Sequence, residues 1–136
     1  MRKTIFFLMV GALAFGCADK KAQEQSLRDS VVDVHERVMG EDEKMLANKS
    51  ALDTLIKQTA DKLVKDSAKI YSDKLALADS DMMTWMHNFN PDQSNQPHDA
   101  VMSYFGKQKR QIVHIDSQMT GLLKETSAYL DKTKKK

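Results

Sequence analysis

The fold of this chain is decided by residues 101–129, VMSYFGKQKRQIVHIDSQMTGLLKETSAY, in which one set of side chains recurs in alternating steps of four and three. The members of the set are Val101, Phe105, Gln108, Ile112, Ile115, Met119, Leu122, Thr126 and Tyr129. This spacing predicts one long helix that carries the set as a single stripe, as in the seam of a coiled coil. We expect the stripe to be buried against other helices.

The residues upstream repeat the same kind of pattern. Between residues 26 and 90 there is no proline and a single glycine, Gly40, which favours helix because proline costs about 3 kcal/mol inside one. A first apolar seam consists of Leu27, Val31, Val34, Val38, Met45, Leu52 and Leu55. A second consists of Ile56, Leu63, Ile70 and Leu77, each seven residues apart. We expect both seams to face the core.

One clear loop separates these segments from the last helix, at residues 90–99, NPDQSNQPHD. Alternating strand patterns are absent, so the sequence predicts an all-α chain. Three antiparallel helices, packed as coiled-coil-like hairpins, bury the stripes most simply, and a fourth helix follows if a turn lies between residues 40 and 50. The stripes are compatible with an intramolecular bundle and with self-association of the chain.

The N-terminal stretch MRKTIFFLMVGALAFGC, residues 1–17, resembles a bacterial lipoprotein signal. Arg2 and Lys3 precede an apolar run that is too short to span a membrane, and Cys17 follows it. We therefore expect a signal peptide over residues 1–16 and lipid attachment at Cys17. Residues 17–25 are then a lipidated cysteine and tether, residues 26–131 the helical bundle and residues 132–136 a basic tail.

Cleavage before Cys17 changes the charge balance. The chain has 21 basic and 19 acidic residues, and loss of Arg2 and Lys3 leaves 19 of each. A neutral mature chain does not indicate nucleic-acid binding. The expected location is the cell envelope, lipid-anchored at the outer membrane, either facing the periplasm or exposed at the surface.

Residues 80–91, SDMMTWMHNFNP, hold the most distinctive side chains of the mature chain. Met82, Met83, Trp85, Met86 and Phe89 are expected to form a structural keystone or part of a partner-binding face, because methionine packs well against aromatic rings. The alternative is a copper site that uses Met82, Met83, Met86 and His87, since thioethers and imidazole are ligands that suit copper.

The run Asp81-Met82-Met83-Thr84-Trp85-Met86-His87-Asn88-Phe89 resembles the Met-Met-x-Trp-Met motif of a family of small Gram-negative lipoproteins, sometimes labelled viral A-type inclusion protein. A Val-x-x-Val-His-Glu-x-Val-Met stretch at residues 31–39 and a late helix rich in Gln, Lys and Ile extend the similarity. The resemblance implies a helical lipoprotein and supplies no activity, substrate or catalytic residue.

The mature chain contains no glycine-rich phosphate loop, no His-Glu-x-x-His pair and no nucleophile elbow. We therefore expect no catalytic residues and no cofactor. The expected function is that of a lipid-anchored binding or structural module, with a protein or another envelope component as its partner. The alternative function is periplasmic copper binding through methionine and histidine.

Overall fold

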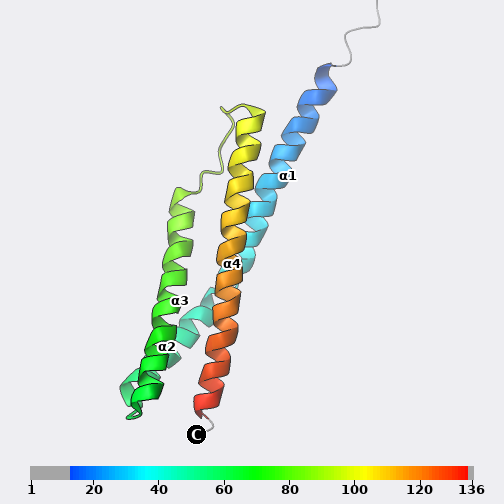
Figure 1. Ribbon diagram of the computed structural model, residues 1–136. Helices are drawn as coiled ribbons and strands as arrows, with labels where there is room; N and C mark the ends of the chain where they lie inside the picture. The colour runs from blue at the N-terminus through cyan, green and yellow to red at the C-terminus, as the bar shows by residue number, and fades with distance from the viewer. Residues whose placement is uncertain (1–12, 135–136) are drawn as a thin grey trace, which may run out of the picture.

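Four helices make up the described part of the chain, and no strand occurs in it. The computed structural model describes the backbone of residues 13–134 and the side chains of residues 19–134. The helices are α1 (Leu13–Met39), α2 (Asp42–Gln58), α3 (Lys62–Asn88) and α4 (His98–Lys134). Because α1 and α2 follow one another along the molecule, the four pieces build three rods (Figure 1). The predicted all-α three-helix bundle is confirmed.

Two short interruptions separate the first three helices. Gly40 and Glu41 form a turn after α1, and α2 then continues toward the same end of the bundle (Figure 1). Residues 59–61 form the second interruption, where the chain reverses. Asp61 caps α3, because its carboxylate accepts hydrogen bonds from the amides of Leu63 at 2.9 Å and Val64 at 3.3 Å.

The first rod, α1 followed by α2, runs parallel to α4 and antiparallel to α3. The contacts between the first rod and α4 join residues whose separation in sequence stays between 74 and 79. From the N-terminal end they are Glu24–His98 (Oε1 to Nδ1, 2.8 Å), Arg37–Asp116 (Nη2 to Oδ2, 2.7 Å), Glu41–Thr120 (Oε2 to Oγ1, 3.3 Å) and Asn48–Thr126 (Nδ2 to Oγ1, 2.8 Å). A constant separation is the signature of two parallel helices in register.

The stripe predicted on α4 is buried as far as Met119 and again at Thr126, while two later positions move on by one residue. Beyond that point Leu123, Thr126 and Leu130 are buried, whereas the predicted Leu122 and Tyr129 are half-buried. An α-helix has about 3.6 residues per turn, so a strict seven-residue stripe rotates by about 20° per heptad. After three heptads a one-residue shift returns the stripe to the core.

The second predicted seam is wrong on α3. Its members there, Leu63, Ile70 and Leu77, are 78%, 57% and 63% exposed. The buried face of α3 consists instead of Ala68, Ser72, Leu75, Ala78, Met82 and Trp85. Small side chains on this face allow α3 to pack closely on α2, where the Ser72 hydroxyl donates a 2.6 Å hydrogen bond to Asp53. A second bond, from Lys49 at 2.8 Å, helps to hold the pKa of Asp53 below its ordinary value.

Five members of the first predicted seam, Val31, Val34, Val38, Met45 and Leu52, are buried, and its two end members, Leu27 and Leu55, are half-buried. The stretch predicted as a tether, residues 17–25, is helical and forms part of α1, which projects past the other helices at its N-terminal end (Figure 1). Its side chains 19–23 are exposed, and Glu24 forms a 2.8 Å contact with His98 of α4. None of the helices within residues 13–134 is both long and apolar enough to cross a membrane.

Candidate functional site

The predicted keystone segment of α3 divides between the core and the surface. Met82 and Trp85 are buried, and Phe89 is half-buried. Met83 and Met86 are 48% and 38% exposed. Residues three or four apart share one face of a helix, whereas immediate neighbours lie about 100° apart around it. The segment therefore packs through one face and leaves two methionines at the surface.

Trp85 lies in an aromatic cluster that joins three helices. Its ring stacks on Phe89 at 4.9 Å between centroids and lies 5.6 Å from the His35 ring on α1. Phe89 in turn lies 6.3 Å from Phe105 on α4. Two nitrogens of the cluster, Trp85 Nε1 and His35 Nε2, are buried without a hydrogen-bond partner among the described residues. A buried polar group without a hydrogen-bond partner generally costs about 1–3 kcal/mol.

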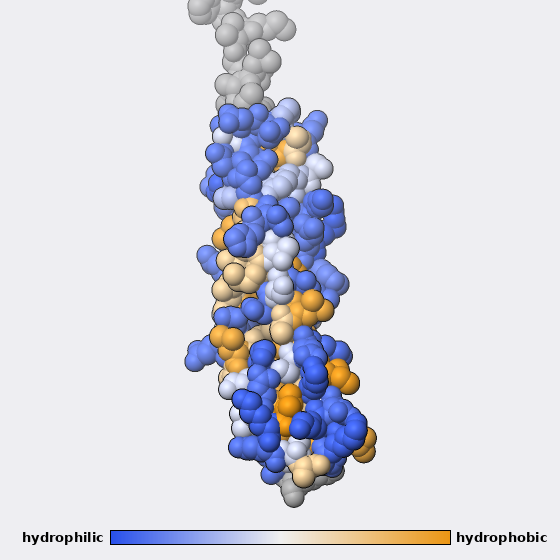
Figure 2. All heavy atoms as spheres, turned by 90° about the vertical axis from the view of Figure 1, so that its left-hand side faces the viewer, coloured by the Kyte–Doolittle hydropathy of each residue, from blue (hydrophilic) through white to orange (hydrophobic). Residues whose placement is uncertain are grey.

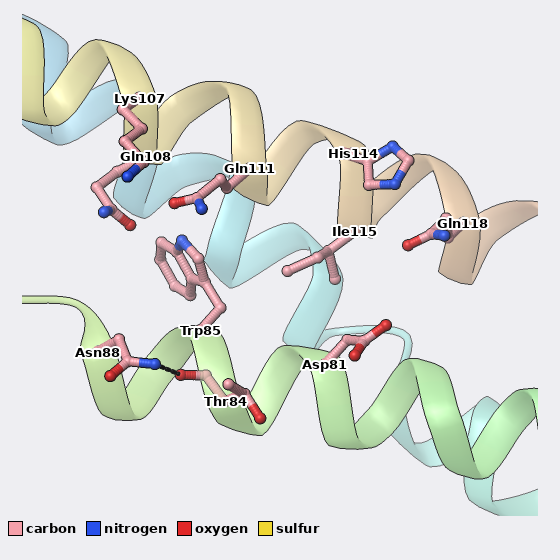
Figure 3. A pocket seen from close by; sticks show the side chains of 10 residues that line it. All are labelled: Asp81, Thr84, Trp85, Asn88, Lys107, Gln108, Gln111, His114, Ile115 and Gln118. Atoms are coloured by element: carbon pink, nitrogen blue, oxygen red, sulfur yellow. Dashed lines mark hydrogen bonds between the residues drawn. The ribbon is translucent and has the colours of Figure 1, made fainter.

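A groove of ≈ 440 Å³ lies between α3 and α4 beside Trp85 (Figure 3). Trp85 and Ile115 lie between the two helices, and the indole nitrogen points toward α4 (Figure 3). The other lining residues are Asp81, Thr84 and Asn88 on α3, and Lys107, Gln108, Gln111, His114 and Gln118 on α4. Gln108 belongs to the buried stripe and is only 8% exposed.

Amide side chains dominate this groove. Gln108, Gln111 and Gln118 line the α4 wall and Asn88 the α3 wall, where Asn88 Nδ2 donates to the Thr84 carbonyl at 2.9 Å. An amide both donates and accepts hydrogen bonds, and it does not exchange protons with a substrate at neutral pH. The groove is therefore suited to holding a polar group by hydrogen bonds, and Asp81, Lys107 and His114 add three titratable side chains to its lining.

The sequence pattern did not single out Gln111, His114 or Gln118. All three are exposed and lie beside the buried α4 stripe, one position before Ile112, Ile115 and Met119. Gln111 and Gln118 do have a signal in the sequence, because their seven-residue spacing places two amides on one edge of the helix.

A second surface lies on the outward face of α3. Leu63, Ile70 and Leu77, here called the outer stripe, are exposed along this helix, and Figure 2 shows apolar residues spread among hydrophilic ones on the side of the molecule where α3 lies. Within the described residues, five of the eight exposed large apolar side chains belong to α3. They are the outer stripe with Met83 and Met86, and the other three are Met39, Leu46 and Val113.

The residues of the copper hypothesis do not share one environment. Met82 is buried in the core, whereas Met86 is partly exposed. Met83 and His87 are both exposed, one turn apart. Among the described residues no group of three or more His, Cys, Asp or Glu is placed to hold a metal ion. Copper binding through methionine therefore stays a prediction.

Three predictions lie partly or wholly outside the described residues. They are the signal peptide over residues 1–16, acylation of the Cys17 side chain, and the end of the basic tail at residues 135–136. Lys132 and Lys134 do lie in the last turn of α4, where cations favour the negative end of the helix dipole. No protein-family model, curated protein or solved structure matches the chain.

Proposed function

We propose that this chain is a lipid-anchored, non-enzymatic binding module of the cell envelope that recognises its partner through the outward face of α3. The single observation that carries the proposal is the outer stripe, whose three large aliphatic side chains share one face of α3 and are 78%, 57% and 63% exposed. Burying a leucine or isoleucine side chain contributes about 1.5–3 kcal/mol. A helix that exposes several of them is expected to be covered when the protein works.

We propose attachment at Cys17, in the part of α1 that precedes the bundle. Cys17 lies in α1, seven positions before Glu24. Glu24 marks the height at which α4 begins, because it contacts His98, the first residue of α4, at 2.8 Å. At about 1.5 Å per residue, this segment is a helical spacer of about 10 Å between a lipid on Cys17 and the bundle. The bundle then stands off the membrane with its sides free for lateral partners.

The amides of the α3–α4 groove support a binding role. Its amides provide hydrogen bonds to a polar group, and Trp85 beside them is mostly inaccessible. Such a groove adds polar contacts for a partner that already covers α3. We therefore assign the outer stripe the main role and the groove a supporting one.

Co-purification from membranes tests the proposal. The intact, affinity-tagged chain is compared with a variant that carries Leu63→Gln, Ile70→Gln and Leu77→Gln, and with the control Leu46→Gln, which alters a 58% exposed leucine on α2. We expect all three chains to stay folded and membrane-bound, and only the triple variant to lose its partner. Retention of the same partner by the triple variant would contradict the proposal.

A further inference from the structure

The outer stripe is a heptad seam that the bundle does not use. Leu63, Ile70 and Leu77 are spaced by seven, which is the spacing of a helix that packs on another helix, yet each is more than half exposed. We propose that the stripe pairs with the outer stripe of a second copy of this chain, with the two α3 helices parallel. The inference rests on the proposed function, because it names the partner of the same face.

Charged residues on the two sides of the stripe select the parallel arrangement. Residues three positions after a stripe residue lie on one side of it, and residues four positions after lie on the other. Asp66 and Asp73 therefore lie on one side, and Lys74 lies on the other. In a parallel pair whose twofold axis runs along the helices, the Asp73 side of one α3 faces the Lys74 side of the other. Residues with the same number then lie at the same height along the pair. Asp73 of each copy then faces Lys74 of the other, which forms two ion pairs.

An antiparallel pair centred on Ile70 has the opposite outcome. In that pair, the side of α3 that carries Asp66 and Asp73 in one copy faces the same side in the other copy. Asp66 of each copy therefore faces Asp73 of the other, and two like-charged contacts result. Both carboxylates already have intrahelical partners, Lys62 at 2.6 Å and Lys69 at 2.7 Å. These partners reduce the repulsion here and also the Asp73–Lys74 attraction of the parallel pair, but only the parallel pair brings opposite charges of the two copies together. Charge complementarity therefore favours the parallel pair.

Attachment to one membrane imposes the same orientation. Cys17 lies in the part of α1 that projects from one end of the bundle (Figure 1), so two copies anchored in the same leaflet point the same way.

The proposed interface is small. Three apolar side chains per copy cover far less than the area of about 800 Å² per partner that a standard interface buries. The pair is accordingly weak in solution and forms where lateral confinement raises the effective concentration.

Cysteine cross-linking in membranes tests the pairing. The chain has a single cysteine, Cys17, whose thiol is consumed by acylation, so an introduced cysteine is the only free thiol. Leu63→Cys and Leu77→Cys each place a thiol on the stripe. Ala76→Cys is the matched control, since it is exposed on α3 about 100° around the helix from Leu77. We expect each stripe variant to form a disulfide-linked dimer with itself about ten-fold more efficiently than the control.

A charge exchange adds a test of register. In the Leu63→Cys chain, Lys74→Asp should lower the dimer yield, and the further change Asp73→Lys should restore it. Dimers that form only between a Leu63→Cys chain and a Leu77→Cys chain would overturn the parallel arrangement. Yields no higher than for Ala76→Cys would overturn self-pairing. If self-pairing fails but a different protein co-purifies with the parent chain and not with the triple variant, the proposed function is retained. If neither self-pairing nor such a protein is found, the proposed function is rejected as well.

Discussion

The burial pattern of α3 makes a sharp prediction about two leucines that lie two positions apart. Leu75 is 1% exposed and packs in the core, whereas Leu77 is 63% exposed on the outer stripe. Leu75→Ala removes fully buried methyl groups and leaves a cavity, so it should lower the free energy of unfolding by about 2–5 kcal/mol. Leu77 buries about a third of its surface, and full burial of leucine contributes about 1.5–3 kcal/mol. Leu77→Ala should therefore cost less than about 1 kcal/mol.

Equilibrium urea unfolding followed by far-ultraviolet circular dichroism measures both values. The measurement is made at low protein concentration, where self-association does not contribute to stability. The two variants control for each other, because they have the same chemistry in the same helix. Equal costs, or a larger cost for Leu77→Ala, would show that α3 is rotated from its described position and that the outer stripe is part of the core.

Two further predictions concern polar contacts between helices. Asn48→Ala removes the 2.8 Å hydrogen bond to the buried Thr126 hydroxyl and should cost about 1 kcal/mol, measured by the same unfolding assay. Asp53 has its pKa lowered, first by its hydrogen bond with Lys49 and then by that with Ser72, so its stabilisation is present above its ordinary pKa and is lost as the pH falls through the lowered value. Because its side chain is 40% exposed, Asp53→Asn should cost less than about 1 kcal/mol at neutral pH, and the difference from the parent should vanish in acid.

Much of the fold follows from patterns that the sequence displays directly. The stripe on α4 and the first seam predict most of their buried residues because both consist mainly of large apolar side chains. The face of α3 was predicted wrongly for the opposite reason. Its core positions include Ala68, Ser72 and Ala78, which are inconspicuous, while the large residues at sevenfold spacing point outward. Hydrophobic spacing identifies a seam but does not say whether the seam belongs to the bundle or to a partner.

The candidate site was predictable only in part. Trp85 and its methionines stand out by residue type, and the structure divides them between the core and the surface. The α3–α4 groove was not predictable, because its amides come from two helices whose relative rotation is set by packing. Gln108 illustrates the point, since it was expected in the stripe and also lines the groove.

Fatty-acid labelling of the intact chain in cells tests the central claim, attachment by a lipid at Cys17, most directly. A clickable fatty acid is supplied, and the labelled chain is compared with Cys17→Ser, which lacks the only thiol. We predict strong labelling of the parent chain, recovery in the membrane fraction, and loss of both in Cys17→Ser. Labelling that survives Cys17→Ser, or a parent chain that carries no label, would contradict the account.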